Sequence, residues 1–162
     1  MYILLTTIAE TMDRRKFLGS AVAGVATLAL GHQTFGRIVI PQKKERLGVA
    51  LVGLGYYSTD LLAPGLQQTK SCYLAGTVTG TPSKAEKWKQ TYNLPDKNIY
   101  SYDNFDSIAN NPDIDVIYIV LPPSMHAEYS IRAANAGKHV WCEKPMALTE
   151  KECQAMIDAC NK

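Results

Sequence analysis

Two short motifs in this 162-residue chain carry residue types that could do chemistry. The first is the glycine pair Gly53 and Gly55, which follows a short apolar run. Gly53 allows a tight turn at a strand end, and Gly55 allows backbone to approach a pyrophosphate closely. The second is the run Glu143-Lys144-Pro145, which follows a later apolar run. Together the two motifs predict a dinucleotide site with a reactive lysine beside it.

The glycine pair is weak evidence when taken alone, because many strand-to-helix turns use glycine only for its geometry. Its surroundings favour a nucleotide. The third position of the dinucleotide fingerprint calls for a small residue, and here it is Ser58. The helix expected from Thr59 would offer free N–H groups and a positive dipole end to phosphates. Because the turn follows the first buried strand of a βαβ series, we interpret it as a nucleotide site.

The end of the second expected strand bears on the choice between the two nicotinamide cofactors. NAD-preferring sites usually carry an Asp or Glu there, which hydrogen-bonds the ribose 2′-hydroxyl. In this chain no carboxylate precedes Glu86. The segment instead holds possible anion donors at Thr79, Gly80, Thr81, Ser83 and Lys84. These groups predict NADP as the cofactor, with NAD less favoured. The alternative is that Thr81 only caps its helix and that Lys84 is a solvated surface charge.

Alternating strand and helix patterns must position these motifs. Short apolar runs predict five buried strands, over residues 48–52, 73–78, 98–102, 114–121 and 138–142. Helices are expected over 59–69, with a kink at Pro64, and over 104–109. A helix from Pro82 would have Thr81 as its N-cap, and a helix capped by Ser124 would end at Gly137. A last helix would follow a capping box that begins at Thr149. Strands separated by helices imply right-handed crossovers. The predicted fold is therefore a Rossmann-like, doubly wound parallel α/β sheet.

Helical spacing also predicts which face of each helix is buried. The three faces expected to be apolar are Ala85, Trp88 and Tyr92, then Ala127, Ile131 and Ala134, and finally Cys153, Met156, Ile157 and Cys160.

The first 30 residues resemble a twin-arginine export signal. Arg14 and Arg15 precede an uncharged, weakly apolar stretch that is too short to span a membrane as a helix. The alternative is a chance Arg-Arg pair before an amphipathic helix. The interpretation predicts a periplasmic protein, or one anchored on the outer face if the signal is not cleaved. Residues 31–46 have no strong period and are expected to form a linker or arm.

Composition and cysteine spacing exclude several classes of partner. A net charge of +2 with no Lys/Arg stripe argues against a nucleic-acid partner. The four cysteines form no CxxC pattern and no cluster with histidine, so a metal site is not expected. At their expected strand and helix positions they would act as small apolar side chains.

With these residues in view, the chain resembles the glucose–fructose oxidoreductase/inositol dehydrogenase (Gfo/Idh/MocA) family over residues 47–162. The matching pieces are residues 53–58, 111–116, 126–128 and 137–147, of which the last block is the most specific. The export signal and the Tyr56-Tyr57-Ser58 turn look most like the exported glucose–fructose oxidoreductase branch.

The resemblance implies roles for individual residues. Lys144 would lie near the nicotinamide, where it would orient and polarise the reacting hydroxyl or carbonyl of a sugar or polyol. Glu143 would contact the nicotinamide, and the strand end at Leu121 and Pro122 would form the cofactor wall. His126 opens a helix beside this cleft, where a role on the cofactor side and simple capping remain open alternatives.

Two departures from the family pattern affect the predicted function. Family members often carry Asn where this chain has Pro123, so one polar contact to the cofactor is in doubt. The family's substrate domain and the sixth strand of the nucleotide domain are not found in residues 47–162. Three classes therefore remain open: the nucleotide-binding part of an NADP-dependent oxidoreductase, a stand-alone dinucleotide-binding module, and an inactive remnant. A bare fifth strand would leave a sheet edge through which copies of the chain could pair.

Overall fold

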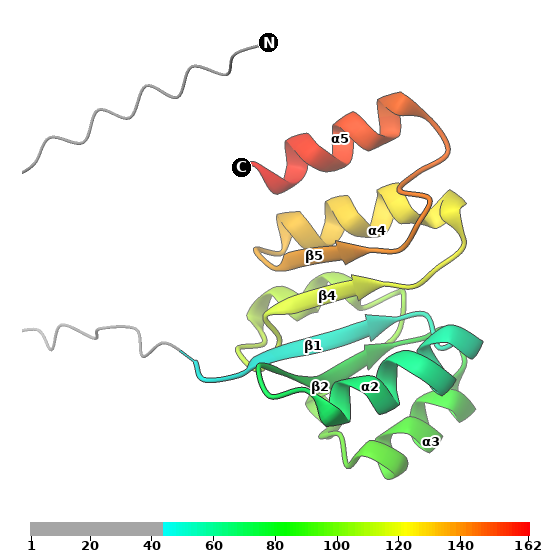
Figure 1. Cartoon of the computed structure of the whole chain (residues 1–162), viewed down its shortest axis with the longest axis vertical. Coiled ribbons are helices and arrows are strands. Elements are labelled where there is room, and N and C mark those ends of the chain that lie inside the picture. The colour runs from blue at the N-terminus through cyan, green and yellow to red at the C-terminus, as the bar shows by residue number, and fades with distance from the viewer. Residues whose placement is uncertain (1–43) are drawn as a thin grey trace, which may run out of the picture. The chain divides into compact units, whose positions relative to one another are not determined.

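A five-stranded parallel sheet forms the centre of the described region, residues 44–162, in the computed structural model (Figure 1). The strands are β1 (Leu47–Val52), β2 (Cys72–Val78), β3 (Ile99–Tyr100), β4 (Val116–Ile119) and β5 (His139–Cys142). Their order is β3-β2-β1-β4-β5, and each neighbouring pair is parallel. The chain reverses its direction of winding between β1 and β4, which is where open α/β sheets bind ligands. The predicted Rossmann-like sheet is confirmed.

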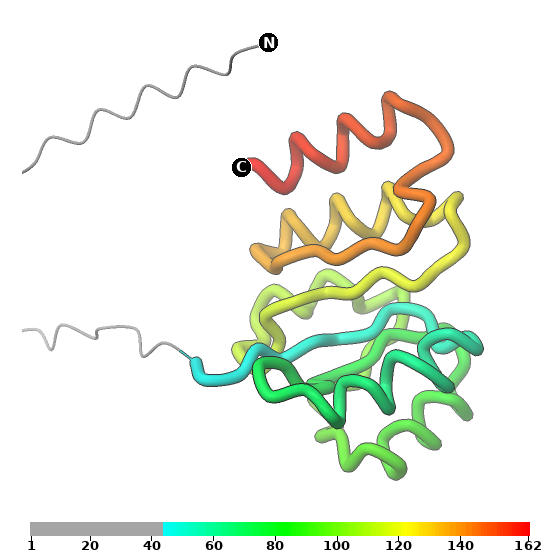
Figure 2. The backbone as a smooth tube through the Cα atoms, in the orientation of Figure 1, coloured from blue at the N-terminus to red at the C-terminus, as the bar shows by residue number. Residues whose placement is uncertain are grey.

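Helical segments connect successive strands and cover both faces of the sheet (Figure 2). They are η1 (Ser58–Leu62), α2 (Ala63–Gln68), α3 (Pro82–Tyr92), η2 (Asp96–Asn98), η3 (Phe105–Asn110), α4 (Pro123–Asn135) and α5 (Glu150–Cys160). The predicted export signal over residues 1–30 lies outside the described residues, as does most of the predicted linker. Within the described part of the chain, no helix is both long and apolar enough to cross a membrane.

Side chains of β1 alternate between two apolar clusters, one on each face of the sheet. Val49 and Leu51 join the cluster that includes Leu66 and Trp88 from α2 and α3. Ala50 and Val52 join the other cluster, in which η3 and α4 also take part. Since both faces are covered, β1 is a nearly continuous apolar run, as expected for a central parallel strand.

Three predicted strands are shorter in the structure, the fifth by one residue and the third and fourth by more. The third strand is confined to Ile99–Tyr100, and the fourth to Val116–Ile119. Ile114 is still buried, but it enters the core from the loop before the fourth strand. Burial of apolar residues therefore extends beyond the backbone pairing that defines a strand, and the apolar run overestimated the length of the ladder.

Of three predictions about helices, one is wrong. The helix after the glycine turn runs without a break through a π-helical stretch, Ser58–Leu62, into α2, so Pro64 lies inside it as predicted. Ser124 does not cap α4, because Pro123 already occupies the first turn and Pro122 is the N-cap. Thr81 is the N-cap residue of α3 as predicted, although its side chain makes no capping bond.

The buried faces of α4 and α5 also differ from those predicted. In α4 the buried residues are His126, Tyr129, Ser130 and Ala133, one position earlier than the predicted face. In α5, Met156 is buried as predicted together with Ala159, whereas Ile157 and Cys160 are exposed. The packing of α4 against β4 and β5, and of α5 on α4, determines these faces. The capping box between Thr149 and Glu152 is confirmed.

Candidate functional site

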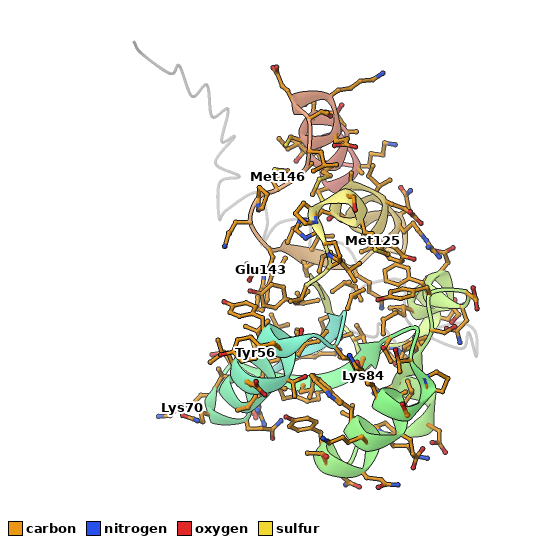
Figure 3. The ribbon with its side chains drawn as sticks, turned by 90° about the vertical axis from the view of Figure 1, so that its right-hand side faces the viewer. Tyr56, Lys70, Lys84, Met125, Glu143 and Met146 are labelled. Carbon is orange, nitrogen blue, oxygen red and sulfur yellow. The ribbon has the colours of Figure 1, made fainter. Side chains whose placement is uncertain are left out.

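The carboxyl ends of the strands lie along one edge of the sheet, and most of the predicted site residues gather there. Figure 3 views this edge, with Tyr56 and Lys84 on one side and Glu143 on the other. Leu121 and Pro122 follow the end of β4, and Pro122 is exposed. The parallel sheet therefore brings together segments that are far apart in the sequence.

The glycine turn after β1 has a backbone that requires glycine at one position. Gly53 has a φ of +93°, and a Cβ there would lie 2.4 Å from the carbonyl oxygen of Val120. At Gly55, by contrast, a Cβ would have no atom within 4 Å. Gly53 is thus needed for the fold of the turn, whereas Gly55 leaves open space above the backbone where a ligand could approach.

Ser58 closes the same turn from inside. Its side chain is fully buried, and its Oγ donates a hydrogen bond to the Gly53 carbonyl oxygen at 2.6 Å. A residue larger than serine would not fit this position without displacing the turn. Thr59 follows on the helix, and both its backbone N–H (3.0 Å) and its hydroxyl (2.8 Å) donate to the Gly55 carbonyl oxygen. Tyr56 and Tyr57, which lie between Gly55 and Ser58, are exposed.

Lys84 links the end of β2 to the glycine turn. It lies in the first turn of α3, and its Nζ donates a hydrogen bond to the Leu54 carbonyl oxygen at 3.1 Å. Thr79 is buried, and its hydroxyl oxygen accepts a hydrogen bond from the Thr81 backbone N–H at 3.2 Å. The exposed Gly80 lies between them. These contacts hold the Lys84 ammonium group beside the glycine turn and fix the Thr79 hydroxyl in the segment after β2.

A cavity of about 450 Å³ opens beside this segment. Thr79, Gly80 and Pro82 line one side of it, and Tyr102 and Asn104, which follow β3, line the other. Gly80 is close to the tyrosine: a Cβ at this position would lie 3.0 Å from the ring of Tyr102. The sequence pattern did not indicate Tyr102 as a site residue.

Glu143 is held by two hydrogen bonds at the end of β5. The hydroxyl of Tyr118, on β4, donates to Glu143 Oε1 at 2.6 Å. The backbone N–H of Lys144 donates to Glu143 Oε2 at 3.3 Å. Trp141 packs edge-on against the Tyr118 ring, with centroids 5.7 Å apart and planes at 86°. The carboxylate is therefore fixed next to the exposed Lys144.

The pKa of Tyr118 is raised well above the ordinary tyrosine value. Burial of the phenol is the largest cause, and the hydrogen bond to the Glu143 carboxylate is the second. The phenol consequently stays protonated and remains a donor to Glu143 through the neutral pH range. Sequence analysis missed Tyr118, although a tyrosine inside a buried strand needs a hydrogen-bond partner, which is a usable signal.

His126 is fully buried and contacts protein on both sides of its ring. Its Nε2 lies 2.7 Å from the Leu121 carbonyl oxygen, and its Nδ1 lies 2.8 Å from the Pro145 carbonyl oxygen. It makes no capping bond at the start of α4, so the capping alternative is wrong. A direct contact of its ring nitrogens with a ligand would require one of these protein contacts to be given up.

The four cysteines are free thiols, and Cys142 is the one nearest to the predicted lysine in sequence. Burial raises the pKa of its thiol, so it is kept in the neutral form and is not an activated nucleophile. Among residues 44–162, no group of three or more His, Cys, Asp or Glu side chains is arranged to hold a metal ion.

Comparison with known proteins identifies relatives across the described region. The model of the oxidoreductase family with an NAD-binding Rossmann fold (Gfo/Idh/MocA) matches residues 47–162. A crystal structure of aldose-aldose oxidoreductase from Caulobacter crescentus superposes with a TM-score of 0.71 and 46% identity, over 72% of this chain and 35% of that one.

Two curated relatives act on named small molecules. Levoglucosan dehydrogenase of Pseudarthrobacter phenanthrenivorans is 55% identical over 53 residues, which are 33% of this chain and 14% of the relative. Inositol 2-dehydrogenase of Salmonella typhimurium is 28% identical over 116 residues, which are 72% of this chain and 34% of the relative. The chain thus spans about a third or less of the length of these relatives.

Proposed function

The chain belongs to the Gfo/Idh/MocA family of oxidoreductases, and on that premise we propose that it binds NADP(H) for hydride transfer with a sugar or polyol. The observation that carries the choice of cofactor is the contact between Lys84 and the glycine turn. This contact places the Lys84 ammonium group beside the glycine turn, in the segment that follows β2. NAD-preferring proteins usually carry a carboxylate at the end of this strand.

The glycine turn fits a dinucleotide pyrophosphate. The open space above Gly55 would admit phosphate oxygens to the backbone, and any Cβ there would occupy that space. Gly53 and Ser58 would hold the turn in shape without touching the ligand. The cavity beside Tyr102 would accommodate the adenosine end of the same molecule.

The 2′-phosphate of NADP would find donors around Lys84. The Thr81 and Ser83 hydroxyls and the Lys84 ammonium surround the start of α3, and all three residues are exposed. Within the first turn of α3 there is no acidic side chain to repel an anion. Charge-assisted hydrogen bonds to phosphate are among the stronger polar contacts, so this segment would favour NADP over NAD.

At the other end of the cofactor, Glu143 and Lys144 would lie beside the nicotinamide. The bound nicotinamide would supply or accept the hydride. Lys144 would donate a hydrogen bond to the reacting hydroxyl or carbonyl oxygen, which orients the substrate and polarises its C–O bond. The substrate class is supported by the names of the relatives, since an aldose, levoglucosan and inositol are all sugars or polyols.

The proposed cofactor preference can be tested by titrating NADPH and NADH into the purified chain. We expect tighter binding of NADPH, and a preference that weakens in high salt because part of it is charge attraction. Lys84→Glu should weaken NADPH binding by about 10- to 100-fold, the loss of one hydrogen bond to a charged group, and spare NADH. Lys87→Glu, an exposed lysine of the same helix, is the matched control and should change neither affinity. Equal affinities, or tighter NADH binding, would refute the proposal.

We also propose that the chain is exported by the twin-arginine route, on the basis of Arg14 and Arg15 and the apolar stretch that follows them. That route carries folded proteins, so the cofactor could be bound before export. Fractionation of a producing cell should find the protein outside the cytoplasm, and replacement of both arginines by lysine should retain it inside. Recovery of the unaltered protein wholly in the cytosolic fraction would contradict the proposal.

A further inference from the structure

The buried His126 connects two segments that the proposed function places at the nicotinamide end of the cofactor. One is the end of β4, through the Leu121 carbonyl oxygen, and the other is the loop after Lys144, through the Pro145 carbonyl oxygen. The contacts of 2.7 and 2.8 Å are both within hydrogen-bond range. The ring has no exposed surface, so water cannot replace either contact.

The rest of the loop has few other ties to the sheet. The Glu143 backbone N–H donates to the Ile119 carbonyl oxygen at 3.0 Å, which continues the β5 ladder to that residue. Farther along the loop, the Cys142 Sγ contacts the Met146 carbonyl oxygen at 3.8 Å, and the Leu148 N–H donates to the Glu152 carboxylate at 3.0 Å in the cap of α5. The Pro145 contact at 2.8 Å is the shorter of the two contacts that fasten residues 145 and 146 to the core, and it is the one made to a fully buried side chain.

We propose that His126 is a positioning residue, which fixes Lys144 at the cofactor by tying the loop to the end of β4. The proposal rests on the proposed function for the role of Lys144. Carbonyl oxygens only accept hydrogen bonds, so the ring holds the Pro145 oxygen through a proton on Nδ1.

The two contacts can be separated by a pair of conservative substitutions. The side-chain amide nitrogen of Asn occupies nearly the position of histidine Nδ1, and that of Gln nearly the position of Nε2. His126→Asn therefore keeps a donor for the Pro145 oxygen, and His126→Gln keeps a donor for the Leu121 oxygen. If the Pro145 contact holds the loop, Gln should release the loop and Asn should retain it.

The measurement is amide hydrogen exchange at Lys144, whose N–H bonds to the Glu143 carboxylate within the loop. We expect exchange about 2- to 12-fold faster in His126→Gln than in His126→Asn, the usual net effect of one hydrogen bond. The Thr79 amide, which donates to the Tyr100 carbonyl oxygen across the sheet, reports global opening and should not distinguish the variants. His139→Gln, at an exposed histidine, is the matched control.

Equal exchange at Lys144 in the Asn and Gln variants would overturn the proposal. If neither variant folds, the protonation of the His126 ring in the unsubstituted chain still tests the proposal. Nitrogen NMR of His126 should show a slowly exchanging proton on Nδ1, and an Nδ1 without a proton would overturn the proposal. Failure of the proposed function would be visible separately in the NADPH and NADH titrations of the unsubstituted chain, and the exchange comparison would still show whether His126 holds the loop.

Discussion

Individual polar side chains in this chain have their orientation set by buried or backbone partners. Ser58, Lys84 and His126 each bond to a backbone carbonyl oxygen at the end of a strand or in the turn that follows. Tyr118 orients Glu143 in a similar way, through a hydrogen bond between the two side chains. For Lys84 and Glu143, which are not buried, such partners reduce rotamer freedom, so that less conformational entropy is lost when a ligand binds.

The Tyr118–Glu143 pair predicts an observable pH dependence. Because the pKa of Tyr118 is raised in the folded protein, its contribution to stability is complete below about pH 10, the unfolded value, and is lost as pH rises through the folded pKa. Glu143→Gln removes the carboxylate and should move the Tyr118 pKa downward, toward its ordinary value. Ultraviolet titration of the phenols measures this, with Tyr118→Phe identifying the late-titrating group. An unchanged titration in the Gln variant would show that burial alone raises the pKa.

At the scale of elements, the site is made by the ends of strands and not by any one helix or loop. β1 supplies the glycine turn, β2 the Thr79–Lys84 segment, β4 the strand end at Leu121 and β5 the Glu143–Lys144 run. The parallel register aligns these four ends, because each strand is paired with its neighbour in the same direction. A change in the register of one strand would therefore displace a whole group of site residues.

The two glycines of the turn predict opposite outcomes for the same substitution. Gly53→Ala puts a side chain at a φ of +93° and within 2.4 Å of the Val120 carbonyl oxygen, so it should destabilise the fold by about 1–3 kcal/mol or more. Gly55→Ala meets no atom of the protein and should leave the stability nearly unchanged. If a pyrophosphate lies above the turn, however, Gly55→Ala should weaken NADPH binding at least as strongly as Gly53→Ala. Denaturant unfolding and cofactor titration of both variants separate these effects, and normal binding by Gly55→Ala would contradict the placement of the cofactor.

At the scale of the whole molecule, the sheet separates two apolar clusters that are both complete around β1. The edge strand β5 is different, because its residues alternate between exposed and half-buried and Trp141 is 41% exposed. The proposed cofactor would contact the ends of β1, β2 and β5, and so would join the well-packed centre to this less buried side.

Cofactor binding should therefore stabilise the molecule as a unit. At a concentration of about 100 times Kd, a ligand that binds only the folded state adds about 2.7 kcal/mol. For a domain of this size that corresponds to a rise in Tm on the order of 10 °C. Thermal unfolding with and without NADPH measures it, and Gly55→Ala serves as the control in which the shift should shrink. A binding titration that saturates without any shift in Tm would indicate that the cofactor also binds unfolded chain.

The sequence by itself determined the fold class, the glycine turn, the capping box of α5 and the family. These features depend on local chemistry: glycine at a positive φ, Thr and Glu three residues apart, and apolar runs separated by helical patterns. The tertiary structure decided the partners of Tyr118 and His126, the buried faces of α4 and α5, and the contact between Lys84 and Leu54. Each of these joins residues that are distant along the chain, or depends on where a helix begins, so no periodicity in the sequence records it.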